Sequence, residues 1–310
     1  MAAIAPHPVT ADVVRARLRG RRVDATGTVF KALLVLAISL SIVILVVLLY
    51  DVISGGASVL TGRLGDLLTG SLGSQPETSG LSQAIRGTFW IGAFVVLFSF
   101  PIGIGAAVYL EEYATKTRFA RFVDVNIRNL AGVPSVVYGI LGLAVFVGTL
   151  QSVTGGRTVI AAGITLAILV LPIVIITSSE AIRAVPNGIR EAGYGVGATR
   201  WEVVRSHVLP YAAPGILTGT VLSLARALGE AAPLILVGAV TGFLGGGASY
   251  GLDSLDDRFT ALPIVIATWA GRPGEGWTSM TSAAIVILLL IVLLANTAAI
   301  VLRNRYERKR

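Results

Sequence analysis

The sequence contains no cysteine, and only two of its 310 residues are histidine, His7 and His207. Without cysteine the chain forms no disulfide and offers no thiolate nucleophile or cysteine-ligated metal. Two histidines so far apart also exclude the HExxH type of metal centre. None of the three lysines, Lys31, Lys116 and Lys309, follows a glycine, so the chain lacks the Gly-Lys pair of a P-loop ATPase.

Charge is scarce as well, and this bears on the class of protein. Charged residues make up 14% of the chain and apolar residues 54%, with a mean hydropathy of +0.80. A soluble domain usually carries about 25% charged residues, so this chain has too little polar surface to cover a soluble globule. We interpret it as an all-α polytopic membrane protein.

Long apolar runs locate the predicted membrane helices, because each can cross about 30 Å of hydrocarbon at about 1.5 Å per residue. The five runs without charge are Ala32–Tyr50, Gly87–Leu110, Asn129–Gly156, Thr158–Ser179 and Gly276–Leu302. A sixth run, Gly215–Val240, is as apolar but contains Arg226 and Glu230. Counting it predicts six membrane helices, of which the first is peripheral and the other five form a core.

The distribution of basic residues predicts the orientation. Of the 25 Lys and Arg residues, 19 lie in the two tails and in two of the connections, and 5 lie in the opposite connections. Because cytoplasmic loops accumulate Lys and Arg, we expect both termini to be cytoplasmic. We interpret the basic N-terminal tail as a topology signal that attracts anionic lipid headgroups rather than as a nucleic-acid site. The first apolar run exceeds the length of a signal peptide, which favours an uncleaved anchor.

The predicted domain organisation follows from the runs and their orientation. We expect a basic cytoplasmic tail over residues 1–28, a first transmembrane helix over 29–51, an external loop over 52–83, a core of five helices over 84–303 that includes a cytoplasmic loop over 180–211, and a basic cytoplasmic tail over 304–310.

Arg226 and Glu230 are the most informative charges, because they lie about halfway along a predicted span. At a spacing of four residues they share one helix face. A charge at this depth costs at least about 2.5–3.5 kcal/mol, so the pair should face the bundle interior or a water-filled path. One interpretation is a solute site in which Arg offers its planar donors to an oxyanion. The other is a self-neutralising ion pair that stabilises packing. Pro233 should kink the helix nearby and Pro134 should start or kink the third span. Gly215 and Gly219 should allow close approach of another helix.

A possible nucleophile motif is weaker. The segment Gly247–Gly251 fits GxSxG, but a nucleophile elbow needs a preceding strand, a following helix and a nearby histidine. This segment lies in a glycine-rich external loop, and both histidines are predicted to be cytoplasmic. We therefore interpret it as a flexible loop.

The cytoplasmic loop Glu180–Tyr211 has the pattern of two short helices. One follows Pro186, a favoured first helical position, and the other is Trp201–Leu209, which we expect to end at Pro210. Short helices between two spans would form a protrusion that docks into a groove of a partner. A solvated amphipathic loop is the alternative.

The same loop carries a recognisable motif. The motif resembles the EAA loop of ABC importer permeases. It consists of Glu191–Gly193, Gly197 after three further residues, and His207–Pro210 after nine more. Two positions depart from the usual pattern, because Gly193 stands where Ala is usual and His207 where an aliphatic residue is usual.

Further segments narrow the resemblance to phosphate-type permeases, and to the PstA type in particular. Four segments are each similar to a stretch of that family and occur in the same order: Tyr109–Ala114, Asn126–Gly139, Leu224–Leu234 and Leu302–Tyr306. Ala231 replaces a usual Thr. The resemblance covers about residues 28–310.

The resemblance implies a type I ABC importer permease that forms half of a phosphate path and catalyses no bond chemistry, with no cofactor in this chain. It implies a multi-pass protein of the bacterial cytoplasmic membrane. The implied partners are a PstC-type permease, a PstB-type ATPase dimer and an extracytoplasmic PstS-type phosphate-binding protein. The implied path residues are Arg226, Glu230, Asn129, Ser135 and Tyr138. The implied ATPase-docking residues of the coupling helix are Arg190, Glu191, Ala192, Gly193, Gly197 and Thr199.

Two other functions remain open from the sequence. One is an ABC permease for another oxyanion, such as molybdate or sulfate, against which the Asn126–Gly139 segment argues. The other is a stand-alone anion channel or secondary transporter, against which the docking-type loop argues.

Overall fold

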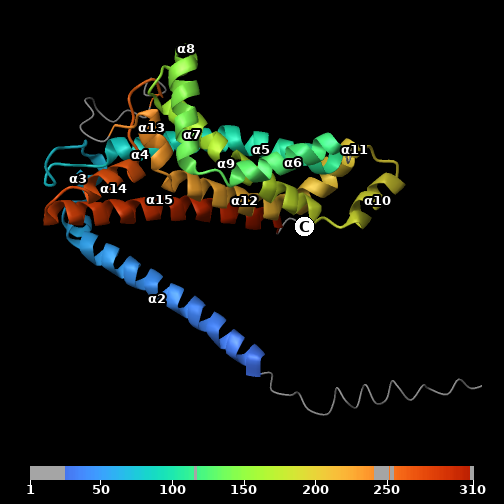
Figure 1. The fold of residues 1–310 in the computed structure, drawn as a ribbon, viewed down its shortest axis with the longest axis horizontal. Coiled ribbons are helices and arrows are strands. Elements are labelled where there is room, and N and C mark those ends of the chain that lie inside the picture. The colour runs from blue at the N-terminus through green and yellow to red at the C-terminus, as the bar shows by residue number, and fades with distance from the viewer. Residues whose placement is uncertain (1–24, 115–116, 241–250, 252–254, 308–310) are drawn as a thin grey trace, which may run out of the picture. The chain divides into compact units, whose positions relative to one another are not determined.

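The computed structural model describes residues 25–114, 117–240, 251 and 255–307. The chain divides into two units, Met1–Asp51 and Val52–Arg310. Within the described residues the chain is helical, and none of them forms a strand (Figure 1).

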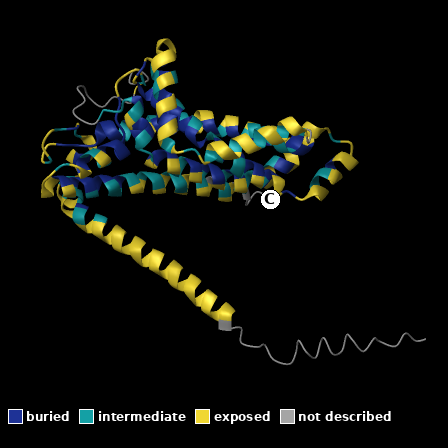
Figure 2. Ribbon diagram, viewed as in Figure 1, coloured by how far each residue is buried: buried dark blue, intermediate teal, exposed yellow. Residues whose placement is uncertain are grey.

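The described part of the first unit is the beginning of α2 (Ala25–Gly62), a helix of 38 residues. Its large apolar side chains from Val29 to Tyr50 are all at least 37% exposed, and Figure 2 shows this stretch as exposed along its length. A helix that is apolar on every side is suited to lipid rather than water. This agrees with the predicted first membrane helix.

The second unit contains the remaining helices and π-helical turns. In chain order they are α3 (Leu64–Thr69), α4 (Ser82–Phe94), η1 (Val95–Ser99), α5 (Phe100–Val108), η2 (Tyr109–Tyr113), α6 (Arg118–Ala131), α7 (Ser135–Gly142), η3 (Leu143–Thr149), α8 (Gln151–Thr154), α9 (Val159–Arg183), α10 (Asn187–Gly195), α11 (Arg200–Val203), η4 (Val204–Val208), α12 (Leu209–Gly229), α13 (Ala232–Val237), α14 (Leu262–Ala270) and α15 (Glu275–Glu307).

The number of spans agrees with the prediction. Among the described residues, five continuous helices are long and apolar enough to cross a membrane. A sixth span results if the bent pair Arg118–Ala131 and Ser135–Thr149 is counted as one. The six predicted membrane helices therefore correspond to five continuous helices and one broken one.

The third predicted span, Asn129–Gly156, differs from the structure at its start. The chain turns by 100° between α6 and α7, so Asn129 belongs to α6 and the apolar helix begins at Ser135. The physical reason is Pro134, which lacks a backbone N–H and disfavours helical geometry in the residue before it. A charge-free run can thus continue across a helix break.

The buried helix α9 lies at the centre of the second unit. It packs against α4, α5, α6, α7 and α12. Leu166, Val170 and Val174 on α9 have no exposed surface, and Figure 2 shows the buried residues gathered along these central helices.

Glycine sets the closest approach between α9 and α12. A Cβ added at Gly219 would lie 2.2 Å from Thr177 Oγ1, and one at Gly215 would lie 2.8 Å from the Cβ of Ala181. The predicted close helix approach at this pair of glycines is confirmed, and it makes α9 and α12 a tightly packed pair.

Candidate translocation site and docking loop

The fifth predicted span, Gly215–Val240, extends past the end of the continuous helix Arg200–Gly229 and is interrupted at Glu230. Helix α12 ends at Gly229, and Glu230 has extended backbone geometry with ψ of 124°. Helix α13 then begins at Ala232, with Pro233 in its first turn. Pro233 cannot donate the hydrogen bond that would continue α12, and its missing N–H is tolerated at the start of the new helix. The predicted kink near Pro233 is therefore a complete interruption of the helix.

Arg226 and Glu230 meet across this interruption. Arg226 Nε lies 3.4 Å from Glu230 Oε1, which is longer than the roughly 2.7–2.9 Å of a strong charge-assisted bond. The Arg226 side chain is 47% exposed and that of Glu230 is 19% exposed. Arg226 also lies in the last turn of α12, where a positive charge is stabilised by the helix dipole. The guanidinium is thus positioned and lightly held, with donors left for an anion.

Helix α7 packs directly against the interruption. A Cβ added at Gly139 would lie 2.7 Å from the Cα of Pro233, so only glycine allows this approach. The neighbouring Tyr138 is 7% exposed, and its hydroxyl donates a hydrogen bond to the carbonyl of Leu130 at 2.8 Å. The Tyr138 hydrogen bond therefore holds α7 to the end of α6. Because Gly139 contacts Pro233, this part of α7 lies beside the interruption that contains Glu230.

The remaining predicted path residues lie on the two sides of the bend. Asn129 is exposed in the last turn of α6, and Ser135 is partly buried at the first residue of α7. Arg226 and Glu230 are the predicted path residues that the structure brings into contact with each other.

The segment predicted to be the cytoplasmic loop forms the two short helices that its pattern predicts, with one difference. Helix α10 begins after Pro186, as expected. Helix α11, however, continues through the π-helical turn η4 into α12, so Pro210 does not end it. Pro210 lies in the first turn of α12, directly after the wide turn, where its missing hydrogen bond is tolerated.

Three predicted docking residues shape this loop. Gly197 has a φ of +83°, a left-handed geometry that favours glycine. Gly193 is buried, and a Cβ there would lie 2.7 Å from Val203 Cγ2, which explains glycine where Ala is usual in the motif. Thr199 caps α11 in a capping box with Glu202, whose carboxylate accepts the Thr199 N–H at 2.7 Å.

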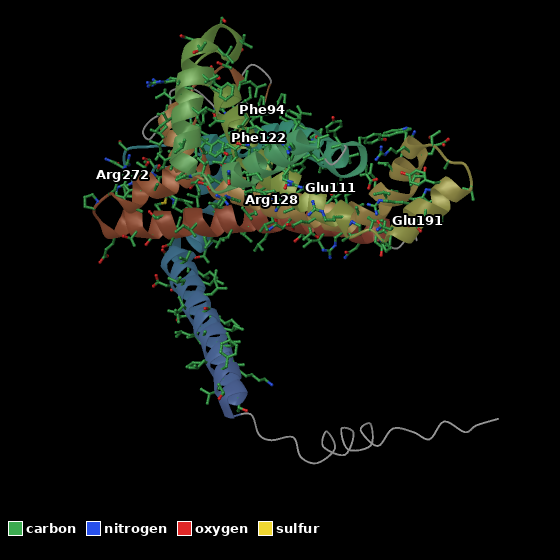
Figure 3. The ribbon with its side chains drawn as sticks, turned by 45° about the vertical axis from the view of Figure 1, so that its right-hand side comes forward. Phe94, Glu111, Phe122, Arg128, Glu191 and Arg272 are labelled. Atoms are coloured by element: carbon green, nitrogen blue, oxygen red, sulfur yellow. The ribbon has the colours of Figure 1, made fainter. Side chains whose placement is uncertain are left out.

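Other residues of the loop face outward. Glu191 and Ala192 are exposed on α10, and Figure 3 shows Glu191 at the opposite end of the helical unit from Arg272. Sequence reasoning missed two exposed apolar side chains, Val196 at 85% and Trp201 at 55%. An apolar residue flanked by glycines within a loop was the available signal for Val196.

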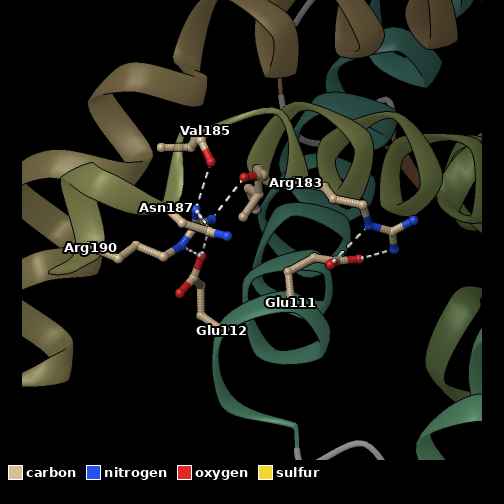
Figure 4. Close-up of polar contacts among 7 residues, drawn as sticks. Glu111, Glu112, Arg183, Val185, Asn187 and Arg190 are labelled. Atoms are coloured by element: carbon tan, nitrogen blue, oxygen red, sulfur yellow. Dashed lines mark hydrogen bonds and ion pairs between the residues drawn. The ribbon is translucent and has the colours of Figure 1, made fainter. Parts of the chain in front are cut away.

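Arg190, the sixth predicted docking residue, points into the protein. Its side chain is 17% exposed and pairs with Glu112 of η2, which is 4% exposed, at 2.7 Å (Figure 4). The adjacent Glu111 forms a two-pronged pair with Arg183, the last residue of α9, at 2.6 and 3.2 Å. Sequence reasoning noticed these acidic residues only within a motif and did not predict their partners.

Two further sequence features, the GxSxG segment and the possibility of a metal site, concern other parts of the chain. The GxSxG segment falls almost entirely outside the described residues, which include only its final Gly251. Within the part of the chain that the structure describes, no three His, Asp or Glu side chains are grouped so as to hold a metal ion.

Comparison with solved structures shows the fold. The chain is similar to a chain of the inward-facing MetNI methionine ABC transporter, with a TM-score of 0.56 and 20% identity, over 76% of this chain and 99% of that one. It is also similar to a chain of a bacterial alginate ABC transporter, crystallised with an alginate-bound periplasmic protein, with a TM-score of 0.63 and 14% identity over 88% and 92% of the two chains.

Comparison with known sequences shows the family. Residues 99–309 match the family "Binding-protein-dependent transport system inner membrane component". The chain is 32% identical to the phosphate transport system permease protein PstA of Haemophilus influenzae, over 70% of this chain and 73% of that protein. It is 32% identical to PstA of Mycobacterium leprae over 86% and 84%, and 33% identical to PstA 1 of Mycobacterium tuberculosis strain H37Rv over 74% and 71%. The chain belongs to the family of binding-protein-dependent transport system inner membrane components and, within it, to the PstA-type permeases.

Proposed function

We propose that this chain is the transmembrane permease subunit of an ATP-driven ABC importer for inorganic phosphate. The observation that carries the proposal is the similarity to several phosphate permeases over most of their length. The chain forms half of the translocation path and couples to a separate ATPase, in which ATP is hydrolysed. The likeness of its fold to two ABC importer permeases supports this role.

The proposed assembly has a partner on each side of the membrane and one within it. The chain is a multi-pass inner membrane protein with both termini in the cytoplasm, as its basic residues indicate. We assign the ATPase dimer to the PstB type, the second permease to the PstC type, and the extracytoplasmic phosphate-binding protein to the PstS type. The opposite positions of Glu191 and Arg272 in the helical unit fit a cytoplasmic ATPase face and an external face (Figure 3).

The interruption of the fifth span supports a role in recognising phosphate. Two unit charges 4 Å apart attract by about 4 kcal/mol at an effective dielectric constant of 20, against about 1 kcal/mol in bulk water. Arg226 would thus bind phosphate more strongly in the path than in solution. Glu230 competes for the same guanidinium and repels the anion, so it favours release. The long Arg226–Glu230 distance of 3.4 Å suits an exchange of partners.

The cytoplasmic loop supports docking to the ATPase. Glu191 and Ala192 face outward from α10 and would meet the partner, while Gly193, Gly197 and Thr199 maintain the loop that presents them. The apolar surface of Val196 and Trp201 extends this area. Removing such side chains from water contributes about 25 cal/mol per Å² of apolar area to a complex, before the costs of association are subtracted.

Uptake of radiolabelled phosphate tests the proposal. Phosphate-starved cells that lack the chain would be supplied with wild type, Arg226→Ala or Arg128→Ala at matched membrane levels. Arg128 is a suitable control, because it pairs at 3.2 Å with Asp124, also four residues away, on exposed α6. We expect wild type and Arg128→Ala to restore uptake and Arg226→Ala to fail.

Three results would contradict the proposal. Equal uptake with Arg226→Ala would remove this residue from the path. Inhibition by molybdate or sulfate as strong as by unlabelled phosphate would assign the permease to another oxyanion. Uptake that persists without the ATPase subunit would favour a stand-alone channel or secondary transporter.

A further inference from the structure

Three consecutive residues of the π-helical turn η2 each contact an arginine from the cytoplasmic end of the fourth span or from the docking loop. Glu111 pairs with Arg183, the last residue of α9, and Glu112 pairs with Arg190 of α10. The ring of Tyr113 lies 5.2 Å from the guanidinium of Arg200 in α11. We name this cluster the η2 clamp; its members are Glu111, Glu112, Tyr113, Arg183, Arg190 and Arg200.

The central pair of the clamp is the most buried. Arg190 donates from Nε and Nη2 to Glu112 Oε1, at 3.0 and 2.7 Å. The outer pair differs, because the Arg183 side chain is 58% exposed and solvent screens it. Removing one member of a buried pair leaves the other charge uncompensated, which is far more damaging than loss of an exposed pair. Glu112–Arg190 is therefore the part of the clamp with the largest energetic effect.

Arg190 also caps the end of α9. Its Nη1 donates to the carbonyl of Val185 at 2.7 Å, and its Nη2 donates to the carbonyl of Ile182 at 2.9 Å (Figure 4). The last carbonyls of a helix lack partners within that helix. The Ile182 carbonyl also accepts the Val185 N–H at 3.2 Å, so the guanidinium adds a second bond there and holds the Val185 carbonyl just past the end of α9. All three of its nitrogens are engaged at once, which the single ammonium of lysine cannot reproduce.

The position of the clamp connects the docking loop to two membrane spans. Turn η2 continues directly from α5, at the end of the helical stretch Ser82–Tyr113, and α5 packs against α9. Only Ala184–Pro186 separate α9 from α10. Apart from Arg190, α10 packs mainly against α11 and η4 of the same loop. Through Arg190, a displacement of α10 is passed to η2 and to the end of α9.

We propose that the Glu112–Arg190 pair is the mechanical link through which the docking helix α10 moves the second and fourth spans. This inference rests on the proposed function, since it names how the ATPase-docking loop is coupled to the path. It gives Arg190 a positioning role inside the permease rather than a contact with the ATPase. Glu112 is a positioning residue as well.

The test measures phosphate transported per ATP hydrolysed in proteoliposomes that contain the complete complex. Glu112→Gln and Arg190→Gln are compared with Glu111→Gln, a matched control that removes the same charge one residue away. We expect the first two to keep the ATPase bound and hydrolysing, with the transport ratio lowered by about tenfold or more, because a buried charge is left unpaired. Glu111→Gln should stay within about twofold of wild type, because its partner is exposed. The double variant Glu112→Gln/Arg190→Gln should be no worse than either single one.

A chemical link keeps the proposal testable if the single variants do not accumulate. Because the chain contains no cysteine, the pair Glu112→Cys/Arg190→Cys can be bridged by a bifunctional thiol reagent. Bridging should raise the amount of phosphate transported per ATP by this variant. An equal amount in bridged and unbridged protein would overturn the proposed role of the Glu112–Arg190 pair.

Two further outcomes separate the alternatives. Loss of ATPase co-purification with Arg190→Gln but not with Glu112→Gln would make Arg190 a docking contact and overturn the link. If wild type carries no phosphate, the proposed function fails, and hydrogen exchange of the α10 amides then decides the inference without reference to any solute. Faster exchange in Glu112→Gln than in Glu111→Gln supports the link, and equal exchange overturns it.

Discussion

Replacing Gly197 by alanine should weaken docking of the ATPase, because the backbone at this position is left-handed. Gly197 has a φ of +83°, and no atom lies within 4 Å of the place where a Cβ would be added. Space is therefore not limiting, and the penalty comes from the backbone alone. Left-handed geometry costs an L-residue about 1–2 kcal/mol, which lowers the population of the docking conformation by a factor of about 5–30.

Gly195→Ala is the matched control for this prediction. Gly195 is also exposed with no atom within 4 Å of an added Cβ, but it is the last residue of α10 and its φ is not positive. Alanine there should leave docking unchanged or strengthen it, because alanine favours a helix by up to about 1 kcal/mol over glycine. The assay is titration of the purified permease complex with its ATPase subunit. Equal dissociation constants for Gly197→Ala and Gly195→Ala would refute the reasoning.

Three further variants test the packing around the site. Gly219→Ala should destabilise the α9–α12 contact by about 1–3 kcal/mol, because its Cβ would overlap Thr177; an unchanged melting temperature of the complex would contradict this. Tyr138→Phe should lower stability by about 1 kcal/mol through loss of its bond to the Leu130 carbonyl, and unaltered hydrogen exchange at the end of α6 would argue against that role. Thr199→Ala should remove the cap of α11 at about 1 kcal/mol and weaken ATPase binding, and full binding would show that the cap is dispensable.

Hydropathy located the membrane helices because a long apolar run is a strong physical signal. Hydropathy alone did not locate the bend between α6 and α7, since Asn129 and the apolar helix that starts at Ser135 belong to one uninterrupted run without charge. The expectation that Pro134 starts or kinks the third span did locate it. The positions of the prolines predicted only some of the helix ends. Pro233 marks a true interruption, whereas Pro210 directly follows a π-helical turn and the helix continues past it as α12.

In the predicted site, contacts between residues close in the sequence were predictable, and contacts between distant residues were not. Arg226 and Glu230 are only four residues apart in the sequence, so their contact was predictable although Glu230 lies just past the end of α12. Glu112 and Arg190 are 78 residues apart in the sequence, and their pairing depends on how α5 and α9 pack. The motif around Arg190 suggested an outward-facing contact, but a motif does not report the direction in which a side chain points.

The most direct test of the central claim is ATP-driven uptake of radiolabelled phosphate into proteoliposomes. Wild type and Arg226→Ala are reconstituted at equal amounts, each together with the ATPase, the second permease and the binding protein. The account predicts uptake that requires ATP with wild type, and loss of uptake with Arg226→Ala while the ATPase remains bound. Phosphate uptake at the wild-type rate with Arg226→Ala, or accumulation by wild type without ATP, would contradict it.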